Sequence, residues 1–177
     1  MDISGRAPGV TIYTDGACSV NPGPGGWGVL LLARNKARYL SGHDPLTTNN
    51  KMELYAAIVA LRTLTKSTRA DLYTDSRYLV DGITNWVHSW KKNNWLTSSK
   101  KPVLNQDLWT VLIEENKKHD IQWNWVRGHS VDRFNSFVDF LATRAIVKRD
   151  QLDLKIDRDE LEKALDTKQI SRLIPIS

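Results

Sequence analysis

The sequence contains one pattern twice, as Val10-Thr-Ile-Tyr-Thr-Asp15 and as Ala70-Asp-Leu-Tyr-Thr-Asp75. Each copy reads as a short β-strand that ends at an Asp, because polar and apolar residues alternate before it. If the two strands are parallel neighbours, both Asp side chains emerge at the carboxyl edge of one sheet, where open α/β sheets bind ligands. The repeated pattern therefore predicts two carboxylates close together at one sheet edge.

The sequence around these two copies predicts the element order βββαβααβα. Strands are expected at 10–14, 27–33, 37–41, 70–74 and 121–125, and helices at 54–64, 76–90, 104–112 and 134–146. Short links between the first three strands favour an antiparallel meander, and helical crossovers let the later two join in parallel. The predicted fold is α/β, with a mixed five-stranded sheet flanked by helices.

Two segments fall outside this pattern. Asn21-Pro-Gly-Pro-Gly-Gly26 is dense in Gly and Pro, so it predicts an irregular loop. Residues 150–177 hold seven acids and five bases and are partly amphipathic, so we treat them as a C-terminal extension to a core domain of residues 1–149. Three roles are open for the extension: it covers the apolar sheet edge, binds a protein partner, or contributes little.

Bulk properties narrow the class of protein. The 177 residues amount to about one domain. Since residues 150–177 carry −2 of the total charge of +5, residues 1–149 carry +7, which suits a polyanionic partner. The single cysteine, Cys18, excludes an intramolecular disulfide and fits a reducing compartment. Residues 1–10 lack a signal-peptide pattern and no apolar run reaches membrane-spanning length, so we expect a cytoplasmic protein.

Four carboxylates are candidates for one site, and each also has a structural interpretation. Asp15 begins an Asp-Gly turn signal, and Asp75 is placed to cap the helix that follows. Glu53 stands three residues after Asn50, which is the spacing of a capping box. Asp139 lies at the edge of an apolar helical stripe, where partial burial would raise its pKa unless a cation compensates. A solvated position on the helix margin also fits Asp139.

The ligand type indicates a hard cation. Converging carboxylates repel each other and stay ionised together only when a cation lies between them. A set of oxygen ligands with little nitrogen or sulfur suits Mg²⁺ or Mn²⁺ and does not suit zinc. Two such ions about 4 Å apart can clamp the attacking and leaving oxygens of a phosphodiester displacement. We therefore predict two Mg²⁺ ions during catalysis, with Mn²⁺ as a substitute.

Residues 86–101 combine indoles and amines without any acid. The segment contains Trp86, Trp90, Lys91, Lys92, Trp95, Lys100 and Lys101. Lysines attract phosphates, and indoles offer flat surfaces to sugars and bases. Trp86 and Trp90 continue an apolar stripe and are expected in the core, so Lys91, Lys92 and Trp95 are the expected exposed binders.

These motifs, taken in order, resemble the type 1 ribonuclease H family of the bacterial kind. Any one of them is weak evidence, but the ordered set covers about residues 8–149 and is highly specific. The resemblance is carried by Tyr13-Thr-Asp-Gly-Ala-Cys18, Asn21-Pro-Gly-Pro-Gly-Gly-Trp-Gly28, Thr47-Thr-Asn-Asn-Lys-Met-Glu-Leu54, Tyr73-Thr-Asp-Ser76, the segment 86–95, Lys100-Lys-Pro-Val103, Asp107-Leu-Trp109, Trp125-Val-Arg-Gly-His129, Asn135 and Asp139.

The resemblance implies a ribonuclease H-like fold and an endonuclease that cuts the RNA strand of RNA–DNA hybrids. It implies metal binding by Asp15, Glu53, Asp75 and Asp139, with 5′-phosphate and 3′-hydroxyl products. It makes His129 a proton shuttle or an aid to product release, which suits an ordinary imidazole pKa near 6.5. Without the family match, His129 reads as an ordinary histidine of a surface loop.

The resemblance also implies which residues contact the substrate. Minor-groove contacts, where 2′-hydroxyls identify RNA, match Cys18, Asn21, Asn49 and Asn50. Without that match, Asn21 is a turn residue and Cys18 a small buried filler. Thr48 matches a contact to a phosphate of the DNA strand, and Lys91, Lys92 and Trp95 belong to the basic protrusion that grips that strand.

The chain departs from the family pattern at three places. Arg77 stands where many relatives have Gln, and it is expected to change 2′-hydroxyl reading or to add phosphate attraction. Ser136 and Phe140 stand where the bacterial pattern often has Glu, and their presence is expected to weaken auxiliary metal binding or to alter the metal preference. The loop 130–134 lacks the usual Gly and Pro, so the mobility of His129 is open.

Two other classes of function compete with the nuclease. A hybrid- or duplex-binding module with weak catalysis would need a broken carboxylate set, and here all four acids are present. Another polynucleotidyl transferase of the same fold would be expected to lack the Asn-Asn and Trp-Lys features. We further expect a monomer with no membrane contact, and a protein partner, if there is one, at the C-terminal extension.

Overall fold

The computed structural model describes residues 9–128 and 131–176. Within these ranges, no helix is long and apolar enough to cross a membrane. The strands are β1 (Val10–Cys18), β2 (Gly23–Leu32), β3 (Lys36–Thr47), β4 (Arg69–Thr74), β5 (Asp120–Trp125) and β6 (Leu152–Asp157). The helices are α1 (Asn49–Thr63), α2 (Arg77–Asp81), a π-helical turn (Gly82–Trp86), α3 (Val87–Lys92), α4 (Gln106–Lys117), α5 (Arg133–Lys148), α6 (Arg158–Asp166) and a 3₁₀ turn (Ile170–Leu173).

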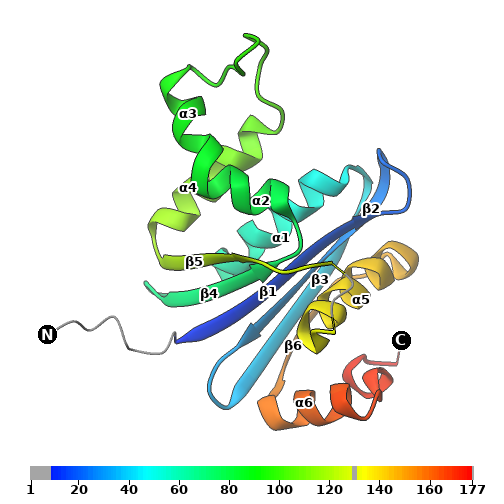
Figure 1. Cartoon of the computed structure of the whole chain (residues 1–177). Coiled ribbons are helices and arrows are strands. Elements are labelled where there is room, and N and C mark those ends of the chain that lie inside the picture. Colours follow the sequence, from blue (N-terminus) through cyan, green and yellow to red (C-terminus); the bar gives the residue numbers. More distant parts are fainter. Residues whose placement is uncertain (1–8, 129–130, 177) are drawn as a thin grey trace, which may run out of the picture.

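The strands form one mixed sheet in the order β5-β4-β1-β2-β3-β6 (Figure 1). The expected meander is confirmed, because β1 pairs antiparallel with β2, and β2 pairs antiparallel with β3. The two expected parallel strands are also confirmed, because β4 pairs parallel with β1 and β5 pairs parallel with β4. The α/β class and the strand connections therefore follow the sequence prediction.

The strand count was wrong by one, because the C-terminal extension adds β6 to the sheet. Leu152, Leu154 and Ile156 of β6 are half-buried, and they alternate with exposed Asp153, Lys155 and Asp157. This strand pairs antiparallel with β3 from Ser41↔Leu152 to Lys36↔Asp157. The sheet consequently continues past residue 149.

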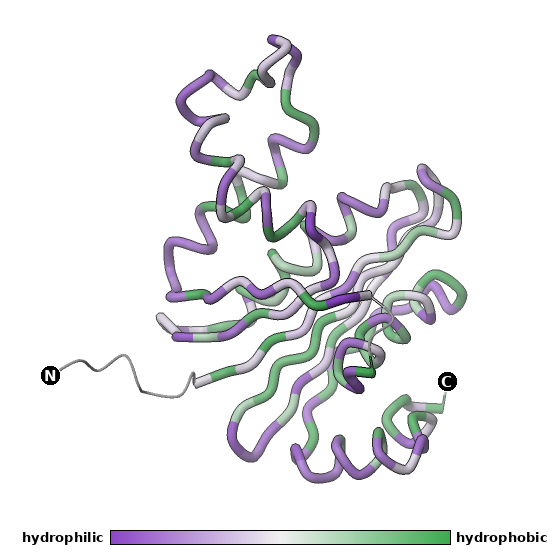
Figure 2. The backbone as a smooth tube through the Cα atoms, in the orientation of Figure 1, coloured by the Kyte–Doolittle hydropathy of each residue, from purple (hydrophilic) through white to green (hydrophobic). Residues whose placement is uncertain are grey.

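Helices cover the two faces of the sheet and enclose two hydrophobic clusters. One cluster joins α1, α2 and α4 to one face and includes Leu54, Leu72 and Trp109. The other joins α5 and α6 to the opposite face and includes Leu30, Tyr39 and Phe137. Figure 2 shows the apolar residues concentrated along the central strands, whereas polar residues dominate α6 and the region around α3 that projects from the body.

The Pro/Gly stretch is mostly strand, which corrects the expectation of an irregular loop. Gly23 to Gly26 belong to β2, and only the residues before them form a turn. A Cβ at Gly26 would stand 2.1 Å from the carbonyl oxygen of Ala142 in α5. The glycine is therefore there because α5 lies directly on the strand, and side-chain-free positions permit that close approach.

The expected single helix over 76–90 is interrupted. It starts at Ser76, whose hydroxyl accepts a hydrogen bond from the Leu79 amide at 3.1 Å. It then passes through the π-helical turn before α3 begins at Val87. Such a turn shifts the register of the side chains that follow, which bears on the Trp residues discussed below.

Candidate active site

Asp15 and Asp75 lie side by side at the carboxyl edge of the parallel strands. The register pairs Ile12 with Leu72 and Tyr13 with Tyr73, so each Asp stands two residues beyond an aligned Tyr. Asp15 remains within β1, so it is not a turn residue. Ser76, not Asp75, caps the helix that follows β4. Neither aspartate therefore has the structural role that the sequence alone allowed.

Glu53 reaches the same place from α1. Thr48 is the N-cap of this helix and accepts a hydrogen bond from the Lys51 amide at 3.2 Å, so Glu53 is not part of a capping box. A Cβ at Gly16 would lie 2.4 Å from the Glu53 amide nitrogen, and only glycine lets β1 pass this close to the helix. Carboxylate oxygens of Asp15, Glu53 and Asp75 lie within 4.8 Å of one another.

The electrostatics of these acids favour a bound cation. Burial and then the charge of Asp75 raise the pKa of Asp15 to about 8. Burial, followed by the charges of Asp15 and Asp75, raises the pKa of Glu53 well above its ordinary value. The Oε2 atom of Glu53 is buried and has no hydrogen-bond partner. A divalent cation would supply that partner and stabilise the ionised acids, so the residues fit a hard metal ion.

Asp139 approaches this cluster from α5, but as an exposed residue and not a partly buried one. It interacts with Asp15, since its charge and a side-chain hydrogen bond are among the causes that raise the pKa of Asp15. It is not among the three acids whose oxygens fall within 4.8 Å. Asp139 therefore lies at the open side of the cluster, where solvent and substrate have access.

The residues expected to contact the minor groove gather around the N-terminus of α1. The Asn21 side-chain oxygen accepts a hydrogen bond from the Asn49 amide at 3.4 Å, which links the β1–β2 turn to the helix. Asn21, Asn49 and Asn50 are exposed. Cys18 is half-buried, and its thiol lies 3.9 Å from the Gly23 carbonyl oxygen. These groups form a polar surface next to Glu53.

Trp125 lies near the site, although the sequence placed it only in a strand and in a family motif, without a role of its own. Its indole nitrogen donates to the backbone oxygen of Asp75 at 3.0 Å, and the Arg77 guanidinium lies 3.9 Å from its ring centroid. The strand register places it there, since Trp125 pairs with Thr74, the residue before Asp75. This stacking holds the exposed Arg77 side chain over the ring of Trp125.

Two tryptophans of the projecting region around α3 differ in solvent exposure from the sequence prediction. Trp86, expected in the core, is 39% exposed. Trp95, expected as an exposed binder, is half-buried with its ring centroid 6.0 Å from that of Trp90, which is also half-buried. The π-helical turn explains the error, because it breaks the helical periodicity that placed Trp86. Lys91 and Lys92 are exposed in the last turn of α3.

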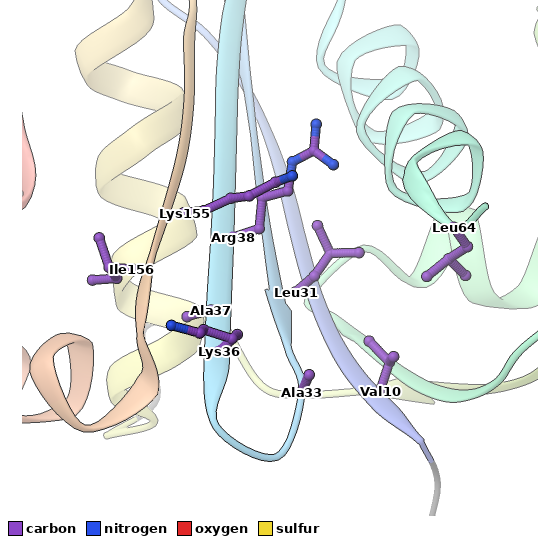
Figure 3. A pocket seen from close by; sticks show the side chains of 9 residues that line it. All are labelled: Val10, Leu31, Ala33, Lys36, Ala37, Arg38, Leu64, Lys155 and Ile156. Atoms are coloured by element: carbon purple, nitrogen blue, oxygen red, sulfur yellow. The ribbon is translucent and has the colours of Figure 1, made fainter.

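A separate cavity has a volume of about 450 Å³, and Figure 3 shows the side chains that line it. It opens beside Val10, five residues before Asp15 and therefore roughly 17 Å from it along β1. The cavity contains none of the residues expected at the site, so it is not where the carboxylates act. Its lining residues are Val10, Leu31, Ala33, Lys36, Ala37, Arg38, Leu64, Lys155 and Ile156.

Comparison with known proteins agrees with this geometry. The family model described as RNase H matches residues 7–147. The chain belongs to the ribonuclease H family. A Ribonuclease H of Erythrobacter litoralis is 55% identical over 136 residues, which is 77% of this chain and 94% of that protein. A Ribonuclease H of Alcanivorax borkumensis is 56% identical over 137 residues, covering 77% and 91%.

A solved structure extends the likeness toward the C-terminus. The crystal structure of LC9-RNase H1, described as a type 1 RNase H with the type 2 active-site motif, is 34% identical to this chain. It superposes with a TM-score of 0.78 and covers 93% of this chain and 83% of its own. The family model ends at residue 147, so β6 and α6 lie beyond the part of this ribonuclease H that the model matches.

The structure shows the surroundings of two residues that depart from the family pattern, Ser136 and Phe140. Ser136 is exposed, whereas Phe140 is half-buried and stacks on Phe137 with ring centroids 6.5 Å apart. Phe140 thus contributes packing where the bacterial pattern often has an acid. His129 lies outside the described residues. A Cβ built on Gly128 would stand 3.1 Å from Oδ2 of Asp75, so the chain just before His129 passes the carboxylates.

Proposed function

We propose that this ribonuclease H hydrolyses the RNA strand of RNA–DNA hybrids with two Mg²⁺ ions held by Asp15, Glu53, Asp75 and Asp139. The observation that carries the proposal is the group of three carboxylates within 4.8 Å, of which Glu53 has a buried oxygen without a hydrogen-bond partner. Mn²⁺, which also prefers oxygen ligands, is the expected substitute. The products are a 5′-phosphate and a 3′-hydroxyl.

The chemistry divides between the cations and the chain's own residues. When bound, the two ions supply activation of the attacking water and neutralise charge on the leaving 3′-oxygen. Asp15 and Glu53, which are both buried, would form the inner part of the site. The exposed Asp139 stands where the scissile phosphate would enter. The proton-shuttle role of His129 rests on the family resemblance alone.

Recognition of the substrate would use two surfaces. Exposed Asn21, Asn49 and Asn50, with Cys18 nearby, can exchange hydrogen bonds with 2′-hydroxyls in a minor groove. Thr48 would contact a phosphate of the DNA strand, and the exposed Arg77, which stacks on Trp125, would attract a phosphate or change the reading of a 2′-hydroxyl. We expect the protein to act as a monomer, because one chain contains all four acids.

The decisive test is cleavage of a labelled RNA–DNA hybrid, with single-stranded RNA and duplex DNA as controls. We expect cutting of the RNA strand only, which EDTA abolishes and Mg²⁺ restores. Asp75→Asn should lose cleavage and keep hybrid binding, because the hybrid contacts lie on other residues. Full activity of Asp75→Asn would contradict the metal assignment. Hybrid binding without cleavage would favour the binding module, and cutting of duplex DNA would favour another polynucleotidyl transferase.

The role of the lysines can be tested through salt dependence. Replacing Lys91 and Lys92 together by Ala should weaken hybrid binding and reduce the log–log salt slope by up to about two units, because fewer counterions are released. The measurement is hybrid affinity by fluorescence anisotropy between low and moderate salt. A matched control replaces the exposed Lys66 and Lys163, which changes the net charge equally. Equal slopes for both double variants would exclude phosphate contacts by Lys91 and Lys92.

A further inference from the structure

The first residue of α5 is tied to the C-terminal extension by charge. Nη2 of Arg133 lies 3.2 Å from Oε2 of Glu162, and Nη1 also pairs with Asp166; both acids are in α6. The same guanidinium lies 4.8 Å from the ring centroid of Phe134. Arg133 therefore joins the start of α5 to two points of α6, which are one helical turn apart.

The residue before Arg133 connects this point to the strands of the active site. Asp132 caps α5 by accepting hydrogen bonds from the amides of Phe134 and Asn135 at 2.9 and 3.2 Å. Its carboxylate also accepts a hydrogen bond from Tyr13, whose pKa is raised by burial first and by Asp132 next. Tyr13 precedes Asp15 by two residues in β1 and stacks on Tyr73 at 5.1 Å between ring centroids.

The helix α6, which carries the two acids that pair with Arg133, is itself packed on the sheet. Leu161 and Ala164 of α6 are buried in the cluster that contains Tyr39 and Phe137. The Tyr39 hydroxyl donates to the backbone oxygen of Leu173 at 2.5 Å. Because β6 also pairs with β3, α6 is held on the sheet independently of Arg133. It can thus serve as a fixed support for the start of α5.

We propose that Arg133 is a positioning residue through which the C-terminal extension sets the place of α5, and hence of Asp139, relative to Asp15 and Asp75. Asp139 follows Arg133 by six residues, or about 9 Å along the helix axis. Small displacements of a ligand-bearing element weaken metal sites and slow catalysis, so a restraint at the helix start affects both. Glu162 and Asp166 lie beyond the family-matched residues 7–147, so this restraint is separate from the matched core.

This role of Arg133 rests on the proposed metal site, and its effect on metal binding can be separated from any effect on stability. Partly exposed ion pairs contribute little to stability, so losing them should change the melting temperature only slightly. A positioning role instead predicts weaker metal binding and a lower kcat, with the KM for hybrid unchanged. Arg133→Ala should raise the Mg²⁺ concentration for half-maximal binding by about 3- to 10-fold, somewhat below the usual effect of residues that directly support a ligand.

The experiment titrates Mg²⁺ into the 177-residue chain by calorimetry and measures hybrid cleavage against Mg²⁺ concentration. The matched control is Arg38→Ala, which breaks the two-bond pair with Asp153 and so loosens the same extension at β3 and β6 without touching α5. It should leave the Mg²⁺ midpoint unchanged. Glu162→Gln with Asp166→Asn, which breaks the pairs from α6, should reproduce the Arg133→Ala result if Arg133→Ala itself folds poorly.

The outcomes separate this inference from the proposed function. A charge-reversed variant, Arg133→Glu with Glu162→Lys and Asp166→Arg, should restore part of the Mg²⁺ affinity. An unchanged midpoint in both Arg133→Ala and the α6 double variant would overturn the inference, as would equal shifts in Arg133→Ala and Arg38→Ala. If the wild-type chain binds Mg²⁺ but cuts no hybrid, the proposed function fails while the calorimetry still decides the role of Arg133.

Discussion

Asp15→Asn is expected to reduce hybrid cleavage by at least about 1000-fold, because it removes a buried ligand from the centre of the proposed metal site. The same change is expected to stabilise the metal-free protein at neutral and alkaline pH. Asp15 is 5% exposed and lies beside Glu53 and Asp75, so its negative charge is costly when no cation is bound. Loss of activity with gain of stability is the signature of a site built for a cation.

The pH dependence of this gain follows from the raised pKa. The ordinary Asp pKa of 3.8 applies to the unfolded chain, and burial with the neighbouring acids raises the pKa to about 8 in the folded one. The folded state therefore binds more protons than the unfolded state between these values, and the stability of the metal-free protein falls as pH rises through this window. The amide introduced by Asp15→Asn does not titrate, so the advantage of this variant should grow from near zero at about pH 4 to on the order of 5 kcal/mol near pH 8, at about 1.4 kcal/mol per pKa unit.

Urea unfolding in EDTA from pH 4 to pH 8.5 measures this difference. Asp120→Asn is a suitable control, because its side chain is 81% exposed in β5 and should show no such pH-dependent gain. Added Mg²⁺ should stabilise the wild-type protein by mass action and leave Asp15→Asn nearly unaffected. If Asp15→Asn is no more stable than wild type at pH 8 without metal, the proposed repulsion among the acids is contradicted.

The carboxylate edge was predictable because it depends on local pattern and topology alone. Two strands that carry Tyr-Thr-Asp can pair in parallel with both acids at one edge, and the register from Val10↔Ala70 to Tyr13↔Tyr73 agrees. The strand β1 continues past Asp15 to Cys18, which the sequence pattern did not predict. The order of the first five strands depended on the same short-range signals. Burial of Glu53 was not predictable, since it requires the close approach of α1 to Gly16.

Other features depend on contacts that no local pattern reveals. The strand β6 has only six residues, and its alternation of apolar and charged residues is too short to predict a strand by itself. It is a strand because it pairs with β3. Gly26 of β2 was predicted to lie in a loop because the reason for this glycine, the close packing of α5, comes from a segment far along the chain. The π-helical turn similarly changed which tryptophan is exposed. For β6 and for Gly26, tertiary packing overrode local propensity.

Removal of residues 150–177 is expected to cost most of the stability of the fold. The deletion would take away β6, Leu161, Ala164 and Leu173, and would expose the face of the sheet around Tyr39. Burying one Leu contributes about 1.5–3 kcal/mol, so the lost burial approaches the total of about 5–15 kcal/mol for a typical domain. We expect the chain 1–149 to lose cooperative thermal unfolding, or to melt at a much lower temperature.

A single substitution tests the same packing without shortening the chain. Leu161→Ala removes a fully buried side chain and should cost about 2–4 kcal/mol, which lowers the melting temperature by roughly 5–15 °C for a chain of this size. Lys163→Ala is the matched control, since it lies two residues away on the exposed side of α6 and should change stability by less than about 0.5 kcal/mol. Equal melting temperatures for Leu161→Ala and Lys163→Ala would mean that α6 is not packed on the sheet in solution. A large loss of stability in Leu161→Ala alone would show that the extension is part of the folded core, because truncating an exposed side chain changes the free energy of unfolding only slightly.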